Sequence, residues 1–416
     1  MADISFWGGV GVIGSTKVLI AQDGWRILLD FGVEFSSPTS LYRGAVQPRP
    51  ENFLRDLLRV GNAPYIPALY RQDALQGMDL APGDDQRTAV FVSHAHSDHM
   101  GLVGWITPTI PIYCSPDTAR LATALTGSGQ GFSGAMPDLI MVKDRETVNF
   151  GPFRVTRYPV DHDIIGASAY AVETEDGVVA YTGDLRLHGR HPGQTIEFAE
   201  AVRGCRVLVT EGSMLGTGFR ATEPTEFEVD EQFRRSLKAT PGLVLLTLLP
   251  YNLERVDAFL TIAQDVNRVV LFPPAMARFL QAMGISAKVA DATALHEVRQ
   301  NPAQYVVQVS MSSLPDLLDL PLGPGSSFIH ADGEPIGTFD PYWDILKDWL
   351  AFCHTPFWPI GTSGHMSPAD LHQFIEIIHP QIVFPVHSTA PERLVPPPGT
   401  TRWIPQRGRI YSLTHR

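Results

Sequence analysis

Six consecutive positions of the chain carry three imidazoles and a carboxylate, at His94, His96, Asp98 and His99. Imidazole and carboxylate groups are ligands of zinc, manganese and similar divalent metals. The cluster follows the apolar run 89–92, which predicts a strand that ends there. Side chains at i and i+2 of an extended segment point the same way, so His94 and His96 can reach one metal ion. Asp98 and His99, beyond the turn, can then reach a second, whereas the alternative is a polar loop that is merely rich in histidine.

Three further segments place a lone histidine or aspartate after an apolar run, at His162, Asp184 and His387. Each lies where a strand is expected to end, which is the position at which α/β folds place their chemistry. One such residue alone is more often a hydrogen-bonded structural group. All three in this order, after the cluster at 94–99, favour a shared metal site.

Together these residues match the ligand pattern of the metallo-β-lactamase superfamily, which the chain resembles. The resemblance implies an α/β fold, an αββα sandwich with two divalent metal ions at one edge, zinc in preference to manganese. It also implies that His94, His96 and His162 hold one metal. The other metal would be held by Asp98, His99 and His387, with Asp184 bridging the two. Two metals roughly 3.5–4 Å apart can share a hydroxide and lower its pKa toward neutrality.

A long segment separates Glu211 from Thr362–Met366, and this arrangement resembles the beta-CASP nucleases, the branch that includes ribonuclease J. The resemblance implies an α/β beta-CASP domain at 215–360, inserted in a metallo-β-lactamase domain made of 1–214 and 361–416. The chain stops at Arg416, soon after His387. We therefore expect it to lack the C-terminal domain through which ribonuclease J dimerises, and its oligomeric state is left open.

Three marks of the beta-CASP branch have counterparts here. An acid at a strand end is matched by Glu211, and a histidine is matched by His365 in Ser363-Gly364-His365. The third mark is histidine in RNA-cleaving members and commonly valine in DNA-cleaving ones, and it is matched by His387. The resemblance implies a two-metal phosphodiesterase acting on single-stranded RNA or DNA, with a ribonuclease of RNA processing or decay expected first.

The expected chemistry gives each part a role. A metal-bound hydroxide would attack phosphorus, with Asp98 and Asp184 as catalytic metal ligands. His365 would protonate the leaving oxygen as general acid, and Glu211 would orient His365 and favour its charged form. The alternatives are a backbone-bonded histidine at a helix start and a solvated acid. Exonuclease and endonuclease action are both compatible with the sequence.

Substrate contacts are expected from Arg186, which follows Asp184, and from Ser363 and Gly364 at a helix start. Arg186 is equally compatible with a solvated surface. The segment Gly361-Thr362-Ser363 lacks a histidine that ribonuclease J often has there, so sensing of a 5′-phosphate is not carried over. Asp161 and Asp163 are candidates, by adjacency, to accept a hydrogen bond from a ligand histidine.

Composition bounds these hypotheses. The formal net charge of −12 argues against a general electrostatic grip on nucleic acid. It favours the alternative of a hydrolase of small esters, lactones or thioesters at the same metal site. No apolar run reaches the length of a membrane span. Three separated cysteines and an N-terminus without a basic segment predict a cytoplasmic protein.

Overall fold

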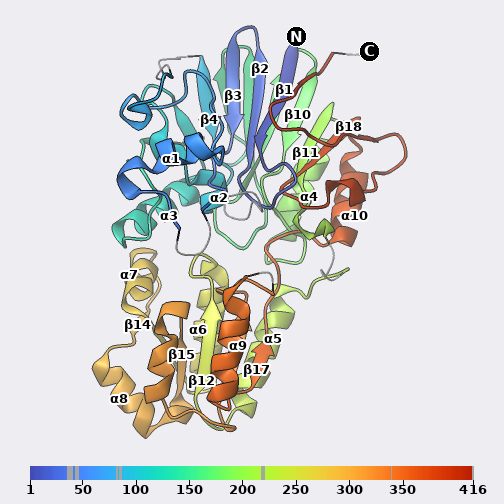
Figure 1. Ribbon diagram of the computed structural model, residues 1–416. Coiled ribbons are helices and arrows are strands. Elements are labelled where there is room, and N and C mark those ends of the chain that lie inside the picture. The colour runs from blue at the N-terminus through green and yellow to red at the C-terminus, as the bar shows by residue number, and fades with distance from the viewer. Residues whose placement is uncertain are drawn as a thin grey trace. The chain divides into compact units, whose positions relative to one another are not determined.

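The computed structural model describes residues 1–34, 41–42, 46–80, 83, 87–216, 221–338 and 340–414, and the chain forms two compact units (Figure 1). The first unit comprises Met1–Thr126, Gly131–Thr222 and Gly364–Arg416. The second comprises Gly127–Gln130 and Glu223–Ser363. These limits fall near the predicted domain limits of 214–215 and 360–361, which remain a prediction. Each unit is described by itself.

Two seven-stranded sheets make up the first unit. The first sheet has the strand order β20 (Ile410–Ser412), β1 (Ala2–Gly8), β2 (Lys17–Gln22), β3 (Trp25–Leu29), β4 (Thr88–Phe91), β5 (Ile112–Cys114) and β6 (Leu139–Met141). The second sheet has the order β19 (Thr401–Arg402), β18 (Ile382–Val386), β11 (Val207–Glu211), β10 (Gly177–Tyr181), β9 (Ser168–Thr174), β8 (Phe153–Pro159) and β7 (Thr147–Phe150).

A single apolar core fills the space between these sheets. Alternate residues of each strand face it, because successive side chains of a strand point to opposite faces. Ile4 and Phe6 of β1 therefore meet Phe384 of β18 and Tyr170 of β9 in one buried cluster. The rings of Phe6 and Phe384 lie 4.8 Å apart.

Helices cover the outer faces of the sandwich, and in Figure 1 α1 and α3 lie beside the first sheet. On the second sheet, Phe198 of α4 and Phe374 of α10 share a second buried cluster with Leu208 of β11. The helices of this unit are α1 (Phe53–Val60), α2 (Ser97–Met100), α3 (Pro116–Gly127), α4 (Pro192–Ala201) and α10 (Pro368–Ile378). The α/β fold class, an αββα sandwich, is thereby confirmed.

The second unit is built on one six-stranded sheet whose paired strands all run parallel. Its strand order is β14 (Lys288–Val289), β13 (Val269–Phe272), β15 (Tyr305–Gln308), β12 (Val244–Leu248), β16 (Ser327–Ala331) and β17 (Phe357–Pro359). Its helices are α5 (Glu226–Ala239), α6 (Leu253–Asp265), α7 (Pro274–Ala282), α8 (Ala292–Gln300) and α9 (Tyr342–Phe352). Phe233 of α5 stacks on Phe259 of α6 with ring centroids 3.8 Å apart.

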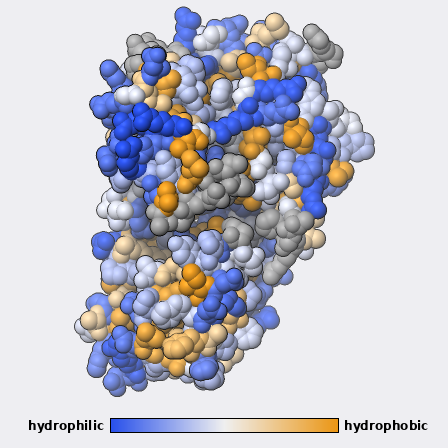
Figure 2. Space-filling view, viewed as in Figure 1, coloured by the Kyte–Doolittle hydropathy of each residue, from blue (hydrophilic) through white to orange (hydrophobic). Residues whose placement is uncertain are grey.

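Among the residues with a described structure, no helix combines the length and the apolar character needed to cross a bilayer. On the face drawn in Figure 2, hydrophobic residues occur in small groups between hydrophilic ones.

Candidate metal centre

The second sheet brings distant parts of the sequence to one edge. Strands β10, β11 and β18 are neighbours and run parallel, with Tyr181 opposite Val209 and Glu211 opposite Val386. Their carboxyl ends therefore lie side by side. Glu211 is the last residue of β11, and the segments that follow β10 and β18 carry Asp184 and His387. The loop after β4 supplies His94 and His96, the short helix α2 supplies Asp98 and His99, and the loop after β8 supplies His162.

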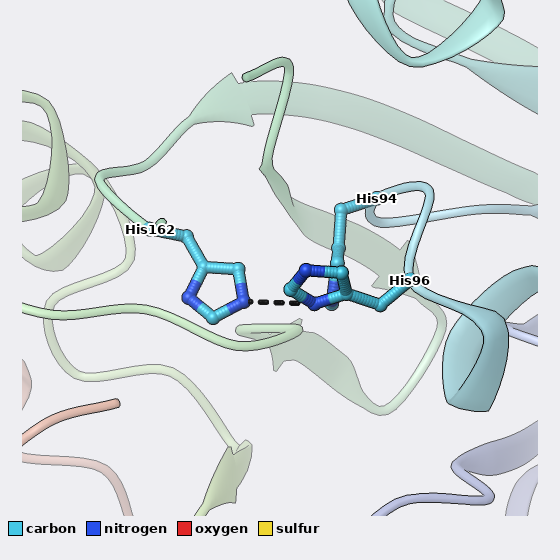
Figure 3. A group of neighbouring side chains, drawn as sticks. All are labelled: His94, His96 and His162. Carbon is cyan, nitrogen blue, oxygen red and sulfur yellow. Dashed lines mark hydrogen bonds between the residues drawn. The ribbon is translucent and has the colours of Figure 1, made fainter. Parts of the chain in front are cut away.

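Three imidazoles converge in a first cluster. Nε2 of His94 lies 3.1 Å from Nδ1 of His96, and that Nδ1 lies 3.3 Å from Nε2 of His162. Figure 3 shows His94 and His96 on the loop after β4, with the ring of His162 directed at them from the loop after β8. His94 and His162 are buried and His96 is partly exposed. This triangle of nitrogen atoms is a suitable ligand set for one divalent metal.

A second cluster lies beside the first and contains Asp98, His99, Asp184 and His387. Nε2 of His99 is 3.0 Å from Oδ2 of Asp184, and Nε2 of His387 is 3.0 Å from Oδ2 of Asp98. The same Oδ2 of Asp184 lies 3.8 Å from Nε2 of His94, in the first cluster. The structure thus brings together all seven predicted ligands, with one oxygen of Asp184 between the two groups.

The outer nitrogen of each buried imidazole has a partner. Such contacts fix the ring orientation and tautomer of a ligand histidine. The pairs are His94 Nδ1 with Ser93 Oγ at 2.9 Å, His99 Nδ1 with Asp30 Oδ2 at 2.7 Å, His162 Nδ1 with the carbonyl oxygen of Gly364 at 2.5 Å, and His387 Nδ1 with Ser213 Oγ at 2.7 Å. In every pair the remaining Nε2 is the atom that faces a cluster.

Asp30 is a site residue that the sequence analysis missed. It is fully buried and its carboxylate accepts hydrogen bonds from the backbone and hydroxyl of Ser93, at 2.6 and 2.7 Å, and from the hydroxyl of Tyr181. Its backbone is left-handed, with φ at 60°. An available signal was the acid that directly follows the apolar strand 25–29, as in the three segments that were recognised.

The electrostatics of the second cluster favour a cation. Burial alone would lower the pKa of His99, but the carboxylates of Asp184, Asp98 and Asp30 raise it well above its usual range. In the first cluster, burial followed by the neighbouring imidazoles lowers the pKa of His94 far below its usual range. Burial also lowers the pKa of His162 to about 4. The lowered pKa values keep His94 and His162 neutral, as metal ligands must be, and the carboxylates around His99 favour a cation in its place, so the residues present fit the implied metals.

His365 and Glu211 lie at the border of the second cluster. Nδ1 of His365 is 3.5 Å from Oε1 of Glu211 and 3.8 Å from Oδ2 of Asp184. Burial opposes the charged form of His365, but Glu211 and Asp184 raise its pKa to about 10. Glu211 is fixed by hydrogen bonds from the backbone N–H groups of Ser213 and Met366, at 2.9 and 3.0 Å. The predicted neighbourhood of acid and imidazole is therefore present.

The side chain of Arg186, a predicted substrate contact, lies inside the protein. Arg186 is fully buried and its Nε donates to Oδ1 of Asp161 at 3.0 Å, so its side chain has a partner inside the protein. Asp163, in contrast, faces the first cluster, with Oδ1 3.2 Å from Nε2 of His162. Gly364 lies against Asp163, whereas Ser363 belongs to the second unit.

The chain is similar to a known family model and to a solved structure. Residues 67–247 match the family model described as "Beta-lactamase superfamily domain". The chain is also similar to a crystal structure of a protein of unknown function from Enterococcus faecalis. The TM-score is 0.83, the sequence identity is 28%, and the match covers 99% of each chain.

Several curated relatives carry the name ribonuclease J. The protein from Mycolicibacterium smegmatis is 25% identical over 64% of this chain and 43% of its own length. The protein from Sinorhizobium meliloti is 24% identical over 76% of this chain and 62% of its own. That of Mycoplasma pneumoniae is 20% identical over 92% of this chain and 67% of its own. The chain spans about half the length of the first two relatives.

Proposed function

We propose that the chain is a metal-dependent phosphodiesterase of the metallo-β-lactamase superfamily, in the beta-CASP branch typified by ribonuclease J, and that it cleaves single-stranded RNA. The observation that carries the proposal is the pair of ligand clusters, with Oδ2 of Asp184 in the second cluster and 3.8 Å from Nε2 of His94 in the first. A small-molecule hydrolase would need the same clusters. The nuclease proposal rests in addition on His365 and Glu211 and on the similarity to ribonuclease J.

Each predicted ligand has an assignment in this proposal. His94, His96 and His162 would hold one ion, Asp98, His99 and His387 the other, and Asp184 would contact both. Two divalent ions, zinc or manganese, would activate water and neutralise charge on the phosphate oxygens. The chain's own part is to hold the rings of His94, His99, His162 and His387 in place, with Nε2 towards the clusters. Their buried partners are Ser93, Asp30, Gly364 and Ser213.

His365 supplies the proton that the reaction needs. Hydrolysis forms a bond between a water oxygen and phosphorus and breaks the bond to the leaving oxygen, which must gain a proton. Glu211 raises the pKa of the His365 imidazole and so favours the charged form that gives this proton. In this proposal Nδ1 of His365 faces Glu211, and the charged ring gives its proton to the leaving oxygen. Glu211 acts through His365 and is a positioning residue.

RNA is proposed over DNA because position 387 is histidine, whereas DNA-cleaving relatives of this branch commonly have valine there.

A second candidate function is the hydrolysis of small esters, lactones or thioesters at the same metal site. The net charge of −12 favours it, because such substrates need no basic surface. The three cysteines are free thiols, which supports a place in the reducing cytoplasm.

The test is digestion of an RNA oligonucleotide labelled at its 5′ end and a DNA oligonucleotide of the same sequence, with zinc or manganese added. Cleavage of RNA that is lost in Asp184→Asn supports the proposal, and the sizes of the labelled products separate exonuclease from endonuclease action. Metal binding without cleavage of either oligonucleotide, together with hydrolysis of a lactone or thioester, would favour the second candidate.

A further inference from the structure

One buried hydroxyl lies between the predicted general acid and a predicted metal ligand. Ser213 opens the short 3-10 helix Ser213–Leu215, directly after β11, and is 2% exposed. Its Oγ is 2.7 Å from Nδ1 of His387 and 3.2 Å from Nδ1 of His365. The roles given above to His365 and His387 do not explain why both rings approach the same oxygen atom.

The contact between Ser213 and His387 bears on metal binding. Nε2 of His387 faces Asp98 in the second cluster, 3.0 Å from its Oδ2. An imidazole that uses Nε2 as a ligand carries its proton on Nδ1. That N–H donates to Oγ of Ser213, which holds the ring at the angle that the cluster requires.

The contact between Ser213 and His365 bears on proton delivery to the substrate. A serine hydroxyl has one proton and two lone pairs, so Oγ of Ser213 can serve both rings at once. The backbone N–H of Ser213 also donates to Oε2 of Glu211 at 2.9 Å, and Oε1 of Glu211 faces His365 at 3.5 Å. Ser213 thus contacts both His365 and the acid that orients it.

We propose that Ser213 is a positioning residue that ties the orientation of His365 to that of His387, and so couples proton delivery to occupancy of the second metal cluster. The inference deepens the proposed function and rests on it. A hydroxyl at this position is required, and a methyl group of similar size cannot replace it.

The experiment compares Ser213→Ala with two other variants. Ser213→Thr retains the hydroxyl. Ser388→Ala removes another buried hydroxyl, adjacent to His387 in sequence, whose Oγ accepts from the backbone N–H of Ala390 at 3.1 Å. Thermal denaturation of each metal-free variant shows that it is folded.

Two readouts separate positioning from general damage. The first is the affinity for zinc, measured by competition with a coloured chelator. The second is the ratio of the rates on an RNA oligonucleotide and on bis(p-nitrophenyl) phosphate. The sugar alkoxide of RNA needs a proton to leave, whereas p-nitrophenolate leaves as a stable anion, so only the first substrate depends on a well-placed acid.

For Ser213→Ala we expect binding of one of the two zinc ions to weaken by about 10- to 100-fold. We expect the RNA rate to fall at least about 10-fold more than the p-nitrophenyl rate. Ser213→Thr should restore both values, and Ser388→Ala should change neither.

Equal zinc affinity and an equal rate ratio in Ser213→Ala and the wild type would overturn the inference and leave the proposed function intact. So would loss of one effect without the other, because the coupling would then be absent. A wild-type chain that binds no metal and cleaves neither substrate would instead overturn the proposed function together with the inference.

Discussion

The carbonyl oxygen of Gly364 accepts a hydrogen bond from Nδ1 of His162 at 2.5 Å, across 202 residues of sequence. The same glycine lies against Asp163, because a β-carbon added to it would stand 2.6 Å from the carboxyl carbon of that residue. A glycine at this position therefore lets the backbone approach both His162 and its neighbour.

Gly364→Ala should weaken zinc binding at the first cluster. The added methyl group must displace Asp163 or the carbonyl that orients His162, and we expect a loss of affinity of at least about 10-fold. Chelator competition measures it. Gly193→Ala is the matched control, since a β-carbon there meets no atom within 4 Å. Unchanged affinity in Gly364→Ala would show that the contact does not orient His162.

Asp30→Asn should weaken binding at the second cluster without loss of the fold. Asparagine tolerates the left-handed backbone of position 30, but it removes the charge beside His99 and one acceptor of the Ser93 and Tyr181 bonds. We expect a decrease in zinc affinity of about 10- to 100-fold and a decrease in the free energy of unfolding of about 1–3 kcal/mol.

Asp23→Asn serves as the control for Asp30→Asn, because Asp23 is another aspartate with left-handed backbone but lies exposed in a turn. Zinc titration and urea unfolding measure the two effects. If both variants bind zinc like the wild type, Asp30 does not support the metal centre.

The contrast between Asp30 and the seven ligands shows what the sequence could predict. The ligands were found because each follows an apolar run, and parallel strands bring such positions to one edge. The contacts of Ser93, Ser213 and Gly364 with the ligand histidines could not be predicted in this way. Serine and glycine are common, and their contacts depend on which loops meet in space.

The side-chain contacts of Arg186 could not be predicted from the sequence either. A basic residue after Asp184 indicated a substrate contact, yet its guanidinium is buried against Asp161. From the sequence we could predict that Arg186 follows Asp184 near the site, but not the direction in which its long side chain points. The α/β class was predictable because strand and helix patterns alternate along both units.

Removal of metal should lower the stability of the wild type. A ligand that binds only the folded state stabilises it by about 2.7 kcal/mol when its free concentration is 100 times the dissociation constant. Scanning calorimetry with and without a chelator should therefore show a lower melting temperature for the chelated wild type. Asp184→Asn should respond much less, and an equal response in both would place the metal elsewhere.

Lys17 should make stability depend on pH. Burial, followed by Arg407, lowers the pKa of Lys17 to about 7, although Glu34, Asp98 and Asp30 act in the opposite direction. Its Nζ donates to the carbonyl and hydroxyl oxygens of Ser15, at 2.9 and 2.8 Å.

In the unfolded chain Lys17 regains its ordinary pKa of 10.5. Between about pH 7 and 10.5 the unfolded state then binds more protons, so the free energy of unfolding rises with pH, by up to about 1.4 kcal/mol per pH unit. Urea unfolding of metal-free protein at several pH values measures the slope. Lys17→Met should reduce it and the exposed Lys143→Met should not, whereas equal slopes in all three proteins would contradict the assignment.

The two hydrogen bonds of Glu211 join backbone segments that lie far apart in the sequence. One joins its carboxylate to the backbone of Ser213 and the other to the backbone of Met366, 155 residues later. The intervening chain, which includes Glu223–Ser363 of the second unit, therefore begins and ends at backbone held by one carboxylate. The same carboxylate that holds both ends of this long segment also faces His365.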